Sequence, residues 1–499
     1  MSGVLFTREV NYNSPYYSIN FDTSGKTDLV TSGKNNPSMQ TEFIYREKIF
    51  LSKKFVNFLK IVRKLEILLK SERLDIEFAK KNKKWYLFQC RRLPKARQKN
   101  DDSEIRKTLI NLKKKIDKLK KTNPTISGTT TYFSNMADWN PAEMVGNKPK
   151  PLAISLYSEL ITDSIWSVQR KDYGYKDVSP NILMVNLAGS PFIDLRTDLN
   201  SFMPSGLNKK IEKKLVDNYL MSLKSKPYLH DKIEFDVVPT CYDFYLNKQN
   251  FKFLNKEEKR FYFFKLKKIT NFVLDQKNNI LKKETDKINL LNIKIKKIEN
   301  SKISEIQKIF FLIDDCKKYG TLPFSGIARI AFVCTKILRS LQDLKIISQK
   351  DVENLYASIP TITKKINKDF VKISKFKNMK NSFFKDYGHL RPLTYSITSP
   401  NYKEGFKTYF SLEVKNKKIK NINNFNLSKE QHKKISRLFL KEQINLDSKK
   451  FFTLFKSSIE NREYGKFIFS KSINQIFENL IRFGKKINIS RSDLEFISI

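Results

Sequence analysis

The chain has 499 residues, enough for roughly three domains at about 150 residues each. Lysine and arginine number 96 against 51 aspartates and glutamates, which gives a formal net charge of +45, while 40% of the residues are hydrophobic and 13% aromatic. An apolar fraction this large excludes a disordered polycation.

The first fifth of the chain mixes strands with one helix. Short β-prone runs at Val4–Thr7 and Tyr16–Phe21 are separated by turn residues and predict strands. A strand this close to Met1 suggests that the chain lacks its natural beginning. From Lys48 to Leu69 apolar residues recur at helical spacing, which predicts an amphipathic helix with Phe50 and Leu68 on its buried stripe.

Two alternating runs follow, at Leu74–Ala79 and Trp85–Arg91, and the lysine-rich turn between them predicts an antiparallel hairpin. Side chains two apart on a strand point the same way, so Asp75 and Glu77 share one face, as Gln89 and Arg91 do on the partner strand. The apolar residues of the other face are expected to pack against the preceding helix: Ile76, Phe78, Tyr86, Phe88 and Cys90.

The rest of the chain is expected to be mainly helical. Residues 98–130 hold a lysine-rich helix and are interpreted as a linker, which precedes a mainly helical domain at 131–499. Asn140–Glu143 offers a capping residue, a proline at the first helical position and an acid in the first turn. Further helices are expected as a pair within 256–300 and at 302–318, 327–344, 349–358 and 361–378. The predicted fold class is therefore α+β.

The polar face of the hairpin suits Mg-nucleotide chemistry. Mg²⁺ prefers oxygen ligands and takes one or two from a protein when phosphates supply others, and Glu77 and Gln89 can provide these. Arg91 can stabilise charge on a transferring phosphoryl group and is the candidate catalytic residue. An exposed hairpin stabilised by ion pairs fits the same pattern.

Asp75-Ile76-Glu77-Phe78 followed by Leu87-Phe88-Gln89-Cys90-Arg91 resembles the Asp-x-Glu-Phe/Trp…Leu-x-Gln-x-Arg segment in the nucleotide-binding domain of phosphoenolpyruvate synthase and pyruvate phosphate dikinase. Ser2–Arg8 resembles that family's Ser-Gly-Val-x-Phe-Thr-Arg strand, and Thr27–Gly33 resembles the glycine-bearing segment after it. The resemblance implies that residues 1–97 are the C-terminal part of an ATP-grasp domain.

The same resemblance implies ATP and Mg²⁺ as cofactors, with Glu77 and Gln89 binding the metal of the nucleotide and Arg91 contacting phosphate. Arg8 has two interpretations that the sequence leaves open. It neutralises phosphate, or it forms an ordinary ion pair on the face of its strand.

Tyr387-Gly388-His389-Leu390-Arg391-Pro392 is similar to the Tyr-Gly-His-Arg-Gly-Pro segment in the middle region of synthase-like phosphotransferases. Asp138–Met144 is similar to a segment of the subgroup that lacks a pyruvate-binding barrel. The resemblance makes His389 and Arg391 candidate substrate-side residues, and a hydrogen-bonded structural role at a turn is the alternative for both. Trp139 and Trp166 are expected in the core rather than as platforms for a ligand.

Enzymes of this family pass the phosphoryl group through a histidine on a mobile domain. None of the three histidines, His230, His389 and His432, has the Gly-Gly-x-x-Ser/Thr-His context of that carrier. We therefore expect an ATP-dependent phosphotransferase similar to pyruvate, water dikinase that is incomplete without an N-terminal lobe and a carrier-histidine domain. The sequence leaves open whether a split gene encodes these parts separately or the reading frame is truncated. Whether the isolated chain is an enzyme stays open.

The positive charge supports an alternative from another class, a non-enzymatic protein that binds RNA, DNA or another polyanion. Only 18 of the 96 basic residues are arginine, and lysine recurs with isoleucine, asparagine and phenylalanine along the whole chain. Phosphate recognition favours arginine gathered on one face, whereas a proteome-wide compositional bias spreads lysine everywhere. We favour the bias and do not expect a nucleic-acid partner.

The cysteines Cys90, Cys241, Cys316 and Cys334 are far apart among apolar neighbours, which predicts buried thiols in a reducing compartment. No apolar stretch of about 18 residues predicts a membrane span, and no secretory leader follows the first residue. A cytoplasmic protein without a membrane partner is expected.

Overall fold

The computed structural model of the protein describes residues 1–23, 39–96, 100–246, 251–375, 379–410 and 425–499. The chain forms two compact units, unit 1 at 1–117 and unit 2 at 118–499. The division falls inside helix α2 (Asp102–Lys120) and within the segment 98–130 that the sequence marks as a linker. A strand-rich unit followed by a helix-rich one confirms the α+β class.

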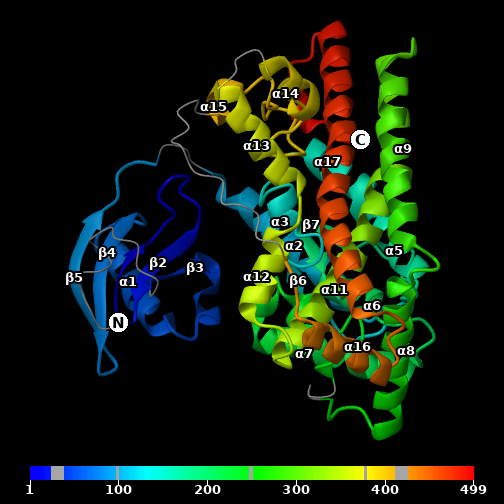
Figure 1. Ribbon diagram of the computed structural model, residues 1–499. Helices are drawn as coiled ribbons and strands as arrows, with labels where there is room; N and C mark the ends of the chain where they lie inside the picture. The colour runs from blue at the N-terminus through cyan, green and yellow to red at the C-terminus, as the bar shows by residue number, and fades with distance from the viewer. Residues whose placement is uncertain (24–38, 97–99, 247–250, 376–378, 411–424) are drawn as a thin grey trace. The chain divides into compact units, whose positions relative to one another are not determined.

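Unit 1 is a five-stranded antiparallel sheet with a helix packed on one face (Figure 1). The strand order is β3-β2-β1-β4-β5, so β1 lies in the middle and β5 at an edge. The elements before α2 are β1 (Ser2–Phe6), β2 (Tyr16–Asp22), β3 (Met39–Tyr45), the 3₁₀ helix η1 (Arg46–Leu51), α1 (Val56–Leu68), β4 (Leu74–Lys81) and β5 (Lys84–Arg92).

The core of unit 1 follows the alternation of the strands. Leu5 pairs with Ile19 on β2 and with Ile76 on β4, and all three are fully buried with residues of α1. Directly paired residues share a face, so this row forms the apolar side of the sheet. Position 3 of the same strand requires glycine, because a Cβ there would come 2.4 Å from the backbone oxygen of Asn20.

The helix predicted at 48–69 is shorter than expected, because Arg46–Leu51 forms a separate 3₁₀ helix and α1 begins only at Val56. Phe50 and Leu68 were expected on the buried stripe, but they are exposed. The stripe that packs on the sheet is Phe55, Phe58, Leu59 and Val62.

The predicted hairpin is confirmed as β4 and β5, joined by Asn82 and Lys83. Both residues have positive φ (51° and 65°), which suits the two-residue turns that match strand twist. The prediction that Tyr86, Phe88 and Cys90 pack against the helix is wrong, because all three are exposed.

A β-bulge explains most of this error. Glu77 pairs with Gln89, but the next residue, Phe78, pairs with Leu87, so Phe88 is an extra residue in β5. One inserted residue moves every side chain before it in the strand to the opposite face of the sheet. Trp85 therefore takes the helix side and stacks on Phe58 with ring centroids 4.4 Å apart, while Tyr86 turns to the other face.

Unit 2 is mainly helical, with one small antiparallel sheet of order β6-β8-β7. Its longest helix, α17, lies alongside α9, α10 and α11 (Figure 1). The strands are β6 (Phe133–Ser134), β7 (Met184–Leu187) and β8 (Ser190–Asp194). The helices are α3 (Pro141–Met144), α4 (Pro151–Tyr157), η2 (Ser158–Thr162), α5 (Ile165–Asp172), α6 (Leu195–Ser201), α7 (Lys209–Ser225), η3 (Pro227–Leu229), η4 (Ile233–Val237), α8 (Lys256–Leu274), α9 (Ile280–Glu299), α10 (Glu305–Cys316), η6 (Lys317–Thr321), α11 (Leu322–Asp343), α12 (Gln349–Ala357), α13 (Ile362–Lys375), α14 (Lys380–Tyr387), α15 (Phe406–Tyr409), α16 (Lys429–Lys441), α17 (Ser448–Lys486) and η8 (Asp493–Phe496).

The predicted helices of this unit are confirmed, with the pair within 256–300 as α8 and α9 and the following four as α10 to α13. Trp166 is fully buried in the core, as expected, and Trp139 is only partly buried. Cys241, Cys316 and Cys334 are buried as predicted, and burial raises the pKa of the first two thiols to about 12.

One stretch of the described residues, Glu305–Asp343, is long and apolar enough to cross a membrane by length and composition, which differs from the expectation of none. The structure buries 72% of its most apolar window. Burial of this extent is typical of a core helix.

Candidate functional site

The predicted nucleotide site lies on the face of the β4–β5 hairpin that points away from α1. Glu77 pairs directly with Gln89, and Asp75 pairs with Arg91 two residues along. Because paired residues share a face and Ile76 between them is buried on the other side, all four polar side chains lie on one surface. The structure thus brings Glu77, Gln89 and Arg91 together as the alternation predicts.

Asp75 fixes the position of Arg91. Its side chain is 7% exposed and accepts a hydrogen bond from Nε of Arg91 at 2.7 Å. This bond raises the pKa of Arg91. The second oxygen of Asp75, Oδ1, is buried without a partner. Within the described part of the chain no contact engages the terminal nitrogens of Arg91, which is 63% exposed, so they can bind an oxyanion.

Glu77 and Gln89 have no side-chain hydrogen bond or ion pair to any residue that the structure describes. They offer a carboxylate and an amide oxygen from adjacent strands. Among the described residues, no group of three or more His, Cys, Asp or Glu side chains could hold a metal ion. One carboxylate and one amide oxygen are ligand types that Mg²⁺ accepts beside phosphate oxygens.

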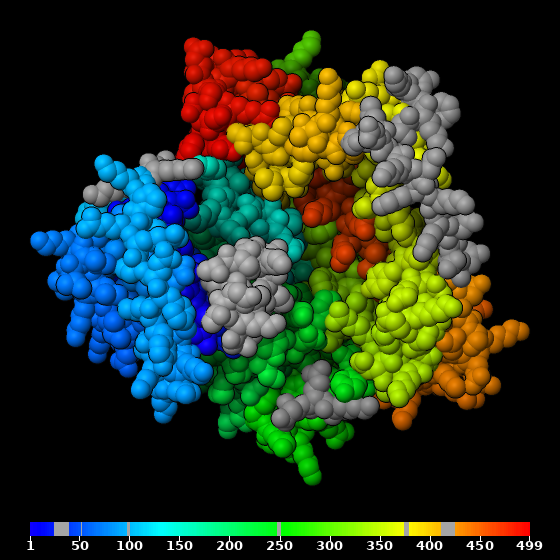
Figure 2. All heavy atoms as spheres, turned by 90° about the vertical axis from the view of Figure 1, so that its left-hand side faces the viewer, coloured from blue at the N-terminus to red at the C-terminus, as the bar shows by residue number. Residues whose placement is uncertain are grey.

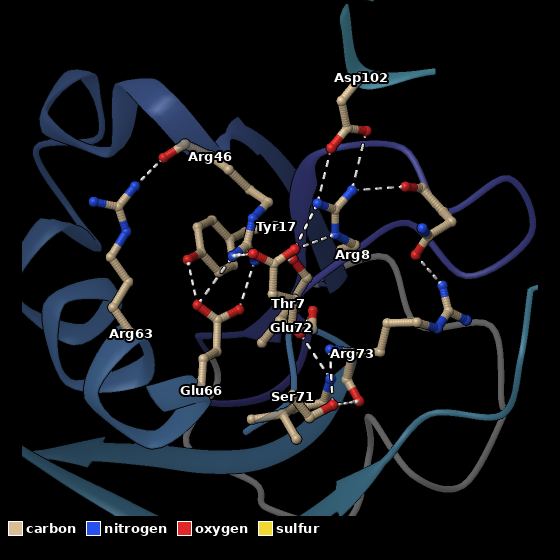
Figure 3. A network of polar contacts seen from close by, with 12 residues as sticks. Thr7, Arg8, Tyr17, Arg46, Arg63, Glu66, Ser71, Glu72, Arg73 and Asp102 are labelled. Atoms are coloured by element: carbon tan, nitrogen blue, oxygen red, sulfur yellow. Dashed lines mark hydrogen bonds and ion pairs between the residues drawn. The ribbon is translucent and has the colours of Figure 1, made fainter. Parts of the chain in front are cut away.

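Arg8 lies in a polar network at the end of β1, 9% exposed (Figure 3). Its guanidinium donates to Glu72 at 2.6 Å, to Asp102 at 2.9 Å and to the carbonyl of Asn13 at 3.1 Å. The bond from Arg8 lowers the pKa of Glu72. Of the two roles that the sequence left open, the ion pair is the one that the structure contains.

The same network is anchored by the buried carboxylate of Glu66 (Figure 3). Arg46 donates to its two oxygens at 2.5 and 3.1 Å, and the hydroxyl of Tyr17 donates at 3.1 Å. Arg46 also donates to the carbonyl of Thr7 at 2.8 Å, whose hydroxyl donates to the carbonyl of Glu72 at 2.6 Å. Thr7 and Arg8 of the opening motif thus join β1 to the residues that lead into β4.

His389 lines a cavity of about 760 Å³ in unit 2. Its Nε2 donates to the carbonyl of Phe467 on α17 at 3.2 Å. Burial, and secondly the charge of Lys471, lowers the pKa of His389 to about 3. The ring is therefore neutral at physiological pH, with Nδ1 as its acceptor. Basic residues outnumber acidic ones in the lining: Lys296, Lys385, Lys403, Lys471 and Arg482 against Glu299, Glu404 and Glu478.

Arg391 is buried beside this cavity and does not line it. It donates to the carbonyl of Ser399 and to Oδ1 of Asn474, both at 2.6 Å, and lies 3.7 Å from Glu478. Burial lowers its pKa to about 10, so it stays charged. Arg391 joins the loop after α14 to α17, whereas His389 faces a space where a ligand fits.

The other two histidines also have hydrogen-bond partners. His230 contacts the hydroxyl of Ser134 at 2.8 Å, and His432 contacts that of Ser448 at 2.9 Å. Of the residues quoted for the family resemblance, Thr27–Gly33 lies outside the described residues. No protein-family model matches the chain, and no curated protein is significantly similar to it.

Proposed function

We propose that the chain is part of an ATP-dependent phosphotransferase of the phosphoenolpyruvate synthase type, with Mg-ATP on the polar face of the β4–β5 hairpin. The observation that carries the proposal is the direct pairing of Glu77 with Gln89 beside an Arg91 that Asp75 fixes. Asp75 is already used in an ion pair, whereas Glu77 and Gln89 form no side-chain hydrogen bond or ion pair with a described residue and are available to a ligand.

Each residue of the face has a distinct role in this proposal. Glu77 and Gln89 hold the metal through one oxygen each, and Arg91 donates its terminal N–H groups to phosphate oxygens in the planar geometry that a guanidinium offers. Asp75 orients Arg91 and is a positioning residue. The bound Mg-ATP supplies the phosphoryl group for transfer.

The three histidines favour a carrier on another chain. His389 is neutral and donates to a backbone carbonyl, and His230 and His432 each contact a serine hydroxyl. We therefore assign the phosphoryl-carrying histidine and the second nucleotide lobe to separately encoded partners, as the family resemblance implies.

The test is calorimetric titration of the chain with ATP, with and without Mg²⁺. Glu77→Gln removes the metal-binding charge, and Arg91→Met removes the phosphate contact. Each is expected to weaken Mg-ATP binding about tenfold or more. Arg92→Met is the matched control, because Arg92 carries the same charge on the adjacent residue and, among the described residues, donates to the carbonyl of Leu69 alone.

Binding that is independent of Mg²⁺, or that Arg91→Met and Arg92→Met weaken equally, would refute the hairpin site. It would indicate attraction of nucleotides by the overall charge of +45. A steep fall of that binding with salt would then favour the polyanion-binding alternative, because phosphate contacts release counterions.

A further inference from the structure

A second cavity in unit 2, of about 600 Å³, lies where the Asp138–Met144 segment meets α5, α11 and α17. Its volume is in the range of small-molecule sites. Figure 2 looks onto this part of unit 2, where the orange-red atoms of α17 lie recessed beside the yellow atoms of the 360–400 segment. The lining has an apolar side that includes Met136, Trp139, Phe324 and Phe332.

The backbone of the segment is held in an unfavourable conformation at the cavity. Trp139 and Asn140 both have positive φ, 60° and 41°, a region that costs a non-glycine residue about 1–3 kcal/mol. The carbonyl of Trp139 accepts a hydrogen bond from Tyr157 at 2.7 Å, and its ring lies 5.9 Å from that of Phe324. Asn140 does not cap α3 as the sequence predicts, and its buried Oδ1 has no partner.

Two buried ion pairs form the polar side of the cavity. Arg170 donates to Asp138 at 2.6 Å, and Arg329 donates to Glu234. The guanidinium carbons of Arg170 and Arg329 lie 3.8 and 5.1 Å from the ring centroid of Phe202. Each arginine is thus held by an acidic partner that is little exposed.

Two donors in this wall lack an acceptor. Nε2 of Gln169 and Nε of Arg329 are buried without a partner among the residues that the structure describes, and these two residues are only 3% and 4% exposed. An unsatisfied buried donor costs about 1–3 kcal/mol. Both residues line the cavity, so a small shift of either side chain would let an oxygen atom of a ligand accept from it.

The rim of the cavity adds positive charge. Nζ of Lys466, on α17, contacts the sulfur of Met144 at 3.8 Å and forms no ion pair with any described residue. Partial desolvation, and secondly the charge of Arg462, lowers the pKa of Lys466. Glu463 on the same rim is engaged by Thr363 at 3.2 Å. Glu143 is the acidic residue whose charge acts on Lys466, and no ion pair of Lys466 or Arg462 is found among the described residues, so both cations can attract an anion.

We propose that this cavity binds a small organic anion whose carboxylate or phosphate oxygens accept from Gln169, Arg329 and Lys466 and whose apolar body packs on Trp139 and Phe324. The segment Asp138–Met144 supplies the aromatic wall, and the paired arginines fix the polar one. This site is independent of nucleotide binding on the hairpin of unit 1.

The test uses phenyl phosphate and benzoate as probes of the two head groups, with benzyl alcohol as the neutral analogue and inorganic phosphate as the anion without a body. The readouts are the melting temperature of the full chain and the fluorescence of Trp139, which a Trp139→Phe variant identifies. We expect phenyl phosphate, benzoate or both to raise the melting temperature and change the Trp139 signal. Benzyl alcohol and inorganic phosphate should do neither.

Lys466→Met and Gln169→Leu are expected to weaken binding of the effective probe about tenfold each. The exposed Lys485, also on α17, gives the matched control Lys485→Met, which should bind as the unaltered chain does, as should Arg91→Met of the hairpin. Lys466→Met changes an exposed residue and keeps the test valid if Gln169→Leu does not fold. Equal weakening by Lys466→Met and Lys485→Met, or no response to either anionic probe, would overturn the proposal.

Discussion

Glu66 is a buried carboxylate of unit 1 with two side-chain partners. It is 7% exposed and accepts from Arg46 and Tyr17 (Figure 3). Glu66→Leu fills a similar volume but removes the acceptor of the Tyr17 hydroxyl and the carboxylate partner of Arg46, which keeps its bond to the carbonyl of Thr7. Removing one partner of a buried ion pair costs about 3–5 kcal/mol, and we expect a loss of this size in the free energy of unfolding of unit 1.

Two further variants separate this effect from a general loss of charge. Glu72→Gln changes a carboxylate of the same network whose side chain is 61% exposed, and it should cost no more than about 1 kcal/mol. In the double variant Glu66→Leu/Arg46→Met the orphaned guanidinium is gone. Its cost should therefore be smaller than the sum of the single costs by at least about 1 kcal/mol.

The assay is urea unfolding followed by the fluorescence of Trp85, which stacks on Phe58 in the core of unit 1. Replacing Trp139 and Trp166 by phenylalanine removes the signals from unit 2. A cost of Glu66→Leu below about 1 kcal/mol, or strictly additive costs in the double variant, would refute the inference that the pair is buried and coupled.

Two other predictions concern titration and reactivity. In the unfolded chain His389 gains a proton near its ordinary pKa of 6.5, whereas in the folded chain its pKa is about 3. The contribution of His389 to the stability of unit 2 is therefore complete above pH 6.5 and is lost as the pH falls towards 3. Between pH 7 and pH 4 the loss is about 3 kcal/mol, and His389→Gln should lose correspondingly less in urea unfolding followed by Trp166. With a thiol reagent such as Ellman's, Cys90 alone of the 4 cysteines should react in the folded chain. A second reactive thiol, or labelling that persists in Cys90→Ser, would contradict the burial of the other cysteines.

The polar face of the hairpin was predictable because its information is local. Alternation places Asp75 and Glu77 on one face, and the short lysine-rich turn sets the pairing with Gln89 and Arg91. Alternation also identified Asp75 without giving it a role, although its position opposite Arg91 was the signal for the ion pair. The β-bulge at Phe88 has no comparable local signal, and this one inserted residue made the prediction for Tyr86 wrong.

The helices of unit 2 could be predicted because apolar spacing is a local signal. The partners of their polar residues could not, because those contacts join distant segments. Apolar spacing marks α8 to α13, but the partners of Arg391 and His389 come from α17, at Asn474 and Phe467. Such contacts between segments far apart in the chain depend on packing. The sequence therefore named both residues as candidates but could not separate the one that lines a cavity from the one that joins two segments.

The segment around Trp139 shows both what a local rule predicts and where it fails. Asn140-Pro141 predicts a helix start, and α3 begins there, yet the same local rules give Asn140 a capping role that it does not have. Left-handed conformations at two adjacent non-glycine residues persist only where the surroundings impose them, and here Tyr157 and Phe324 do so. The positive φ angles, the unpaired oxygen of Asn140 and the unpaired donors of Gln169 and Arg329 each cost free energy of folding. None of these features stabilises the fold. The proposed anion would account for the exposed face of the ring and for the unpaired donors, whereas Oδ1 of Asn140 is itself an acceptor and would need a donor that an oxyanion does not have.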